Sequence, residues 1–126
     1  MISPFVKFAK YFVSDAGAIP AAKIRSHFKI NGVNPDIAEI QLNKIKHKNL
    51  CISNGINIPR FQYIKDMDNI NEKIKDVKYP VIVKPSIGSG SRGVSKVHNP
   101  EDLHSSLSEA CSYDENNEVI VEEFIE

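Results

Sequence analysis

A lysine followed by a glycine-rich segment is the part of this sequence best equipped to do chemistry. Lys84 lies near the end of the apolar run Val81–Pro85. Glycines let the backbone adopt positive φ angles and bring several N–H groups close to one phosphate. An ammonium group beside them neutralises part of the charge of a polyphosphate. The segment therefore predicts a phosphate-binding loop, with glycines in a G-x-G-x-x-G pattern at Gly88, Gly90 and Gly93.

The residues around this loop exclude three familiar kinds of phosphate loop. A Rossmann turn runs directly into a helix, whereas Val94–His98 alternates apolar and polar residues as a strand does. A Walker A loop has Lys and then Ser or Thr after its last glycine, where this chain has Val94. In protein kinases the phosphate-pairing lysine follows the loop, whereas Lys84 precedes it. What remains is a strand with a lysine, a flexible flap that contains Arg92, and a returning strand. That arrangement suits a lid over a polyphosphate and disfavours a dinucleotide-binding oxidoreductase.

Composition excludes several other classes of protein. The chain has 126 residues, of which 41% are hydrophobic and 25% charged, and its formal net charge is zero. These values allow a core and argue against global disorder. No apolar run approaches the roughly 18 residues that span a bilayer, and the N-terminal stretch lacks a secretory signal pattern. The basic residues are scattered without interleaved aromatics, which disfavours nucleic-acid binding. Cys51 and Cys111 are far apart and the four histidines show no ligand spacing, so we expect buried, reduced thiols in a cytoplasmic protein.

Apolar periodicity and capping residues predict the elements that must position the loop. Residues 2–28 predict a helix, with a break or kink between Gly17 and Pro20. Asn34 and Asn99, each followed by proline and an acid, predict two further helix starts. The order of elements predicts an α+β fold: a small, mostly antiparallel four-stranded sheet with helices, preceded by a helical segment. Helices are also expected over residues 43–54 and 68–77, and strands over residues 60–65, 81–85, 93–98 and 119–125.

Four motifs follow one another along residues 14–126. A helix begins with an Asn-Lys pair at 43–44 and ends, eleven positions after the lysine, in a Gly-Ile-Asn-Ile-Pro segment at 55–59. A Tyr-Pro-Val-Ile-Val-Lys-Pro strand, a Ser-Gly-Ser-Arg-Gly-Val flap and a strand with paired acids occupy 79–85, 89–94 and 119–125. Together they resemble the ATP-grasp superfamily, particularly its biotin carboxylase and carbamoyl-phosphate synthetase large-chain branch. The serines in the flap differ from the all-glycine version of biotin carboxylases, which favours relatives like carbamoyl-phosphate synthetases or amino-acid ligases.

The resemblance implies a nucleotide site, residue by residue. Lys44 and Lys84 would contact the phosphates of ATP, with Lys84 spanning α and β. The flap backbone would cap the β- and γ-phosphates, and the last strand would line the adenine, with Glu122 close to its amino group. Neighbours on a strand point to opposite faces, so at most one of the two acids of that strand faces the nucleotide. Arg92 could equally be a solubilising surface residue. The remaining implied binding residues are Ser89, Gly90, Ser91, Arg92 and Gly93 in the flap and Glu123, Phe124 and Ile125 in the last strand.

The resemblance also implies that this chain is an excerpt of a larger enzyme. Residues 1–42 would be the end of a preceding domain, and residues 43–126 an incomplete first ATP-grasp lobe that ends at the hinge strand. The parent would be an ATP-dependent carboxylate–amine or carbamoyl-phosphate-synthetase-like ligase, acting on a carboxylate or bicarbonate and an amine through an acyl phosphate. Its magnesium ligands would lie outside this chain, so the excerpt alone would be inactive. A homo-oligomer is compatible with the resemblance, and neither nucleic acid nor a membrane is expected as a partner. The alternative is a stand-alone, non-catalytic module that binds a nucleotide or another protein.

Overall fold

The computed structural model describes residues 14–126 of the chain. Contacts divide the chain into two compact units, with the boundary between His47 and Lys48. The predicted helical positions before residue 14 lie outside the described residues. Among the helices described, none combines the length and the apolar character that crossing a bilayer requires.

The first unit contains two helices whose starts follow their capping residues. Helix α2 (Asp15–His27) begins after Ser14, whose hydroxyl accepts a hydrogen bond from the Gly17 amide. Of the break or kink predicted between Gly17 and Pro20, the break is wrong, because α2 continues through Pro20. A proline near the start of a helix has the φ angle that a helix needs and removes only one backbone hydrogen bond. Helix α3 (Pro35–Leu42) begins as predicted, with Asn34 Oδ1 accepting from the Asp36 amide at 2.8 Å.

Helix α4 (Lys44–Ser53) includes the boundary between the two units. Asn43 caps its start, since its side-chain oxygen accepts from the amides of Ile45 and Lys46 at 3.0 and 2.9 Å. Gly55 follows its end with a φ of 69°, the left-handed conformation common after a helix. The predicted helix over residues 43–54 is therefore confirmed.

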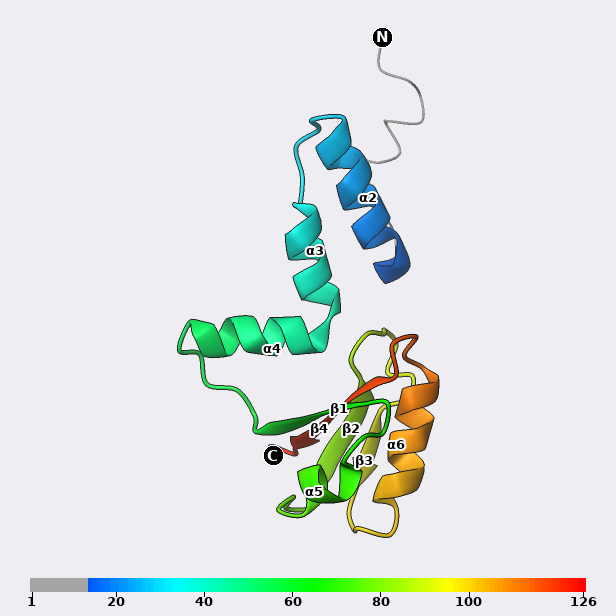
Figure 1. Ribbon diagram of the computed structural model, residues 1–126. Helices are drawn as coiled ribbons and strands as arrows, with labels where there is room; N and C mark the ends of the chain where they lie inside the picture. Colours follow the sequence, from blue (N-terminus) through cyan, green and yellow to red (C-terminus); the bar gives the residue numbers. More distant parts are fainter. Residues whose placement is uncertain (1–13) are drawn as a thin grey trace. The chain divides into compact units, whose positions relative to one another are not determined.

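The second unit is built on a four-stranded antiparallel sheet in the order β1-β4-β2-β3, as Figure 1 shows. The predicted fold class is confirmed. The last strand of the chain, β4, lies at the centre, so residues far apart in sequence become neighbours. Its Glu122 is opposite Phe61 on one side and Ile82 on the other. The strands are β1 (Phe61–Lys65), β2 (Val81–Pro85), β3 (Ser95–Val97) and β4 (Glu118–Glu123).

One face of the sheet, which we call the core face, packs against helices α5 (Ile70–Ile74) and α6 (Leu103–Ser112). Figure 1 shows α6 running along this face. Leu103, Leu107 and Ala110 of α6 have no exposed surface, so this helix is held by its apolar side. The core cluster comprises Ile64, Ile70, Val81, Val83, Val97, Leu103, Leu107, Ala110, Val119 and Val121.

The opposite face, which we call the charged face, carries the alternate residues of the same strands. Strand residues alternate between faces, so the register determines which side chains share this surface. Lys84 is opposite Ile120, and Glu122 is opposite Ile82. The charged face comprises Phe61, Tyr63, Lys65, Ile82, Lys84, Lys96, Glu118, Ile120 and Glu122.

The bounds of four predicted elements differ from the structure. Helix α6 begins at Leu103 because Asn99 caps a turn instead, with its side-chain oxygen accepting from the Asp102 amide at 3.0 Å. Helix α5 covers only residues 70–74 of the predicted 68–77, and β3 only residues 95–97 of the predicted 93–98. Strand β4 ends at Glu123. Pro59 and Pro80, which come before β1 and β2 on either side of β4, have no N–H with which to extend the pairing.

Candidate functional site

Lys84 and Glu122 meet at the centre of the charged face. They project from the adjacent strands β2 and β4, and the Lys84 ammonium donates a hydrogen bond to Glu122 Oε1. Their side chains are only 19% and 12% exposed. Lys84 is therefore not an unpaired lysine at the end of an apolar strand, because β4 supplies its counter-ion.

Lys48 joins this pair from helix α4 of the same unit. Its ammonium lies 2.5 Å from Glu122 Oε2 and 4.8 Å from the centre of the Phe61 ring. Burial by itself raises the pKa of Glu122, but the two ammonium groups outweigh it, so this pKa lies below its ordinary value. Lys48 is not among the site residues predicted from the sequence. The available signal was its position four residues after Lys44, which places both lysines on one side of a helix.

The flap adopts the backbone conformations that its glycines allow. Gly90, Ser91 and Gly93 have φ angles of 67°, 58° and 66°. A Cβ atom at Gly93 would lie 2.6 Å from the Tyr113 ring, whereas at Gly90 it would meet no atom within 4 Å. Gly93 is therefore required by both conformation and packing, and Gly90 by conformation alone. Ser89 is half-buried and Arg92 is exposed.

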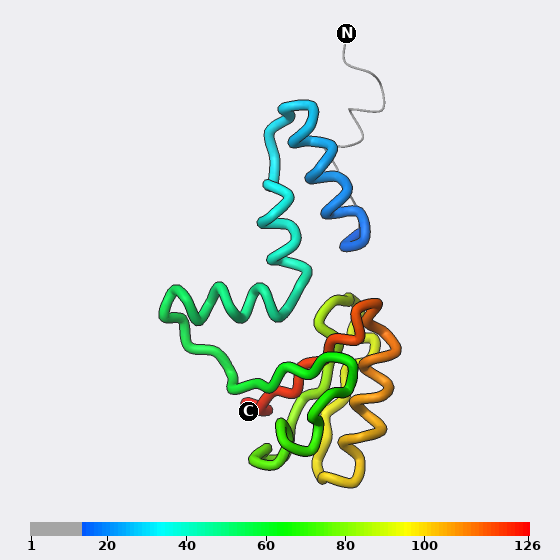
Figure 2. Tube along the Cα trace, in the orientation of Figure 1, coloured from blue at the N-terminus to red at the C-terminus, as the bar shows by residue number. Residues whose placement is uncertain are grey.

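Asp114 binds the residues that come just before the flap. This carboxylate is 4% exposed, and its Oδ2 accepts from the Ser86 hydroxyl at 2.7 Å and from the Ile87 amide at 2.9 Å. Burial raises the pKa of Asp114, but the hydrogen bonds from Ser86 and from three backbone amides outweigh that effect. The pKa of Asp114 therefore lies below its ordinary value. Figure 2 shows the flap and the segment after α6 at the same end of the sheet. Nothing local in the sequence signals this contact, because it joins residues 27 and 28 positions apart.

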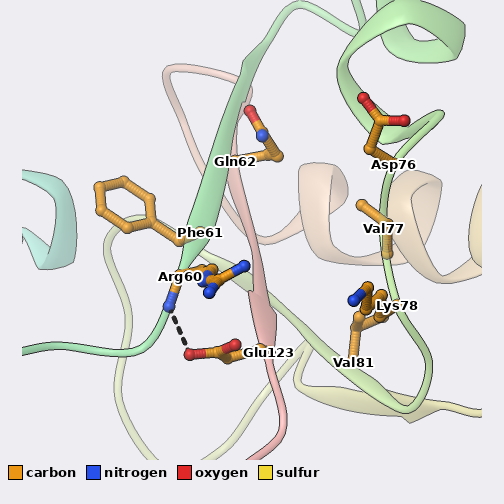
Figure 3. A pocket seen from close by; sticks show the side chains of 8 residues that line it. All are labelled: Arg60, Phe61, Gln62, Asp76, Val77, Lys78, Val81 and Glu123. Carbon is orange, nitrogen blue, oxygen red and sulfur yellow. Dashed lines mark hydrogen bonds between the residues drawn. The ribbon is translucent and has the colours of Figure 1, made fainter.

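The three hinge residues that follow Glu122 lie in different surroundings. Glu123 is on the core-face side of β4, where its Oε1 accepts from the Arg60 amide at 2.9 Å. It lines a hollow of about 260 Å³ with Val81, Asp76 and Lys78 among others, as Figure 3 shows. The Glu123 side chain is thus on the face opposite Glu122. The two acids point apart, as the strand alternation predicts.

Phe124 and Ile125 lie just beyond the end of β4. Lys96 of the charged face lies 3.4 Å above the centre of the Phe124 ring. The amides of Glu123 and Phe124 donate to the carbonyl oxygens of Arg60 and Pro80, so they are not available to a ligand. Ile125 is 63% exposed. Of the hinge amides after Glu122, the Ile125 amide is the one left for a main-chain contact.

Lys44 begins helix α4 in the first unit and is half-buried there. Its predicted contact with a phosphate stays a prediction. The structure brings together Lys84 and Glu122, adds Lys48, and joins the flap directly to the strand that carries Lys84.

These groups fit a nucleoside polyphosphate better than a metal ion. Two ammonium groups, a carboxylate and a glycine flap share one face and its end, and they supply cations and N–H donors for phosphate oxygens. Both oxygens of Glu122 face an ammonium group, Oε1 that of Lys84 and the buried Oε2 that of Lys48. Over residues 14–126, no group of three His, Cys, Asp or Glu side chains could hold a metal ion.

Comparison with known proteins identifies ligases as relatives. A family model described as the D-ala D-ala ligase C-terminus matches residues 50–126. The D-alanine–D-alanine ligase of Lacticaseibacillus casei (strain BL23) is 35% identical over 107 residues, which are 81% of this chain and 29% of that protein. The crystal structure of D-alanine–D-alanine ligase from Helicobacter pylori matches with a TM-score of 0.75 and 25% identity, over 86% of this chain and 33% of that one. The VanG D-Ala:D-Ser ligase of Enterococcus faecalis shares the fold, with a TM-score of 0.78 at 24% identity, over 86% of this chain and 33% of that one.

The chain thus spans about three tenths of the length of the curated D-alanine–D-alanine ligases of Lacticaseibacillus and Pediococcus that it matches. The ATP-grasp resemblance is confirmed at the level of the superfamily. The predicted biotin carboxylase and carbamoyl-phosphate synthetase branch is not confirmed, since these relatives are D-alanine–D-alanine ligases.

Proposed function

Because the chain belongs to the D-ala D-ala ligase C-terminus family, we propose that it is the first nucleotide-binding lobe of an ATP-dependent carboxylate–amine ligase. The observation that carries the proposal is the Lys84–Glu122 pair on the charged face, at the foot of a glycine flap. The names of the relatives favour amino acids as both substrates. Residues 43–126 would form the lobe, and residues 1–42 would be the end of a preceding domain.

In this proposal the chain contributes charge neutralisation and positioning. Such a ligase transfers the terminal phosphoryl group of ATP to a carboxylate, and the amine then displaces phosphate from the acyl phosphate. Lys84 would turn from Glu122 to the α- and β-phosphates, and the flap amides between Ser89 and Gly93 would cover the β- and γ-phosphates. Lys44 is the further predicted phosphate ligand. Magnesium would lower the barrier by neutralising the same phosphates, with ligands outside this chain.

The base would lie against the end of β4. An adenine edge offers an amino donor beside a ring-nitrogen acceptor, so it needs one acceptor and one donor from the protein. Glu122 Oε1 would accept from the amino group once Lys84 has turned to the phosphates, and the exposed Ile125 has an available amide. The Glu123 side chain is on the other face of the sheet and takes no part.

The test is Lys84→Ala in the intact protein. We expect kcat/KM for ATP to fall about 10²–10³-fold, the usual effect of removing one group that stabilises developing charge. The fold should persist, because Glu122 retains Lys48 as a partner. Lys75→Ala is the matched control, since Lys75 is exposed and directly follows α5. Near-normal turnover in the Lys84→Ala protein would contradict the proposal. Tight ATP binding without turnover by the wild-type protein would favour the non-catalytic module instead.

A further inference from the structure

Glu122 is held from two directions by two ammonium groups. Lys84 donates a hydrogen bond to Oε1 from the neighbouring strand, and Lys48 lies 2.5 Å from Oε2. The side chains of Lys48 and Glu122 are each only 12% exposed. A carboxylate removed from water to this extent needs a counter-ion, and breaking a buried ion pair by removing one partner is strongly destabilising.

Lys48 is placed more firmly than a surface lysine. Its backbone lies inside helix α4, and its ammonium also lies 4.8 Å from the centre of the Phe61 ring. Phe61 is directly opposite Glu122 in the pairing of β1 with β4. A cation that contacts both an aromatic face and a carboxylate has little freedom to leave.

In the proposed function Lys84 leaves Glu122 for the phosphates, and Lys48 stays as the counter-ion of Glu122. Lys84 cannot be a full partner of Glu122 while its ammonium contacts the α- and β-phosphates. Without a second cation, burial would favour the protonated carboxyl group, which raises the pKa of Glu122. The hydrogen bond from Lys48 is the strongest single influence that lowers this pKa. The carboxylate can therefore remain ionised after Lys84 has turned away.

We infer that Lys48 is a positioning residue for base selection: it holds Glu122 as an oriented acceptor while Lys84 engages the phosphates. This inference rests on the proposed function. An ionised carboxylate only accepts hydrogen bonds, so it pairs with the amino group of adenine. Guanine presents a carbonyl oxygen at that position, which the carboxylate repels. A protonated or rotated Glu122 would lose this discrimination.

The experiment measures the affinities of ATP and GTP for the intact protein by calorimetry. We expect Lys48→Met to reduce the ratio of ATP to GTP affinity by about 10- to 100-fold, the value of a hydrogen bond to a charged group. Lys48→Arg keeps the charge and should restore most of the ratio. Lys46→Met is the matched control, because Lys46 lies in the same helix, is 53% exposed and pairs with Glu39 instead. A merely structural role would lower both affinities alike and leave the ratio unchanged.

The outcomes separate the inference from the function on which it rests. A wild-type ratio in Lys48→Met, with normal ATP binding by the unaltered protein, overturns the inference alone. Failure of the unaltered protein to bind ATP overturns the proposed function. If Lys48→Met does not fold, Lys48→Gln replaces it in the same comparison. Glu122→Gln provides a second check, because adding the Lys48 substitution to it should change the ratio no further.

Discussion

Asp114 accepts four hydrogen bonds that fix the backbone just before the flap. Oδ2 accepts from Ser86 and Ile87, and Oδ1 accepts from the amides of Asn116 and Glu118 at 2.9 and 3.3 Å. A buried carboxylate with this many donors is more stable ionised than protonated, despite its burial. The residue therefore joins the end of β2 to the start of β4 and gives the flap a rigid base.

Replacing Asp114 by Asn should destabilise the protein at neutral pH. The amide places an N–H₂ group against donors, so we expect a loss of about 1–3 kcal/mol in the free energy of unfolding. The folded-state pKa of Asp114 lies below the ordinary value of 3.8. Its contribution to stability is therefore complete above that value and is lost as the pH falls through the folded-state pKa. Urea unfolding at pH 7 and near pH 3 measures both effects.

The control for this prediction is Asp68→Asn, at an exposed aspartate in the turn after β1. It should change the free energy of unfolding by less than about 0.5 kcal/mol. If the wild-type and Asp114→Asn proteins differ by the same amount at pH 7 and pH 3, the ionised carboxylate is not the cause.

At the scale of elements, helix α6 stabilises the sheet that displays the charged face. Leu103 and Leu107 have no exposed surface and pack with Val83 and Val121 in the core cluster. These valines alternate along their strands with Lys84 and Glu122. Packing of the core face therefore positions Lys84 and Glu122 on the charged face.

Leu107→Ala should cost about 2–5 kcal/mol of unfolding free energy, since it removes buried methyl groups and leaves a cavity. The matched control is Leu50→Ala in α4, where the side chain is 43% exposed. Chemical denaturation of both variants gives the two values. Equal losses would mean that α6 does not hold the sheet as described.

At the scale of the whole molecule, the proposed binding groups lie in the second unit, except Lys44, which lies in the first. Lys48, Lys84, the flap and the hinge all belong to residues 48–126, and the family model matches residues 50–126. The C-terminal part after residue 100, with nine acids and neither lysine nor arginine, contributes Glu122 to the contacts with Lys48 and Lys84. Net charge is therefore a poor guide to the site.

Nucleotide should raise the melting temperature of the intact protein. A ligand bound only by the folded state stabilises it by about 2.7 kcal/mol at a hundredfold excess over Kd. We expect ATP to raise the melting temperature, adenosine to raise it less because it lacks phosphates, and Lys84→Ala to abolish most of the difference. An equal shift with adenosine and ATP would mean that the flap and Lys84 bind no phosphate.

Much of the second unit was predictable from sequence because the signals are local. Alternating apolar residues define β2 at Val81–Pro85, and Asn43 and Gly55 mark the ends of α4. These features depend on the φ angles and side-chain directions of a few adjacent residues. Asn99 shows where a local signal is insufficient, because the same capping residue can begin a turn. The helix then begins only at Leu103.

The sequence by itself predicted the strands, the caps, and a glycine-rich loop that follows a strand carrying Lys84. Only the tertiary structure decided the partners of these groups. Glu122 meets Lys84 from 38 positions away, and Ser86 meets Asp114 from 28. The physical reason is that such partners follow from strand order and register: a central β4 brings the end of the chain beside its earlier lysines. No local pattern encodes that placement, because it results from burying the apolar side of every strand and of α6 in one core.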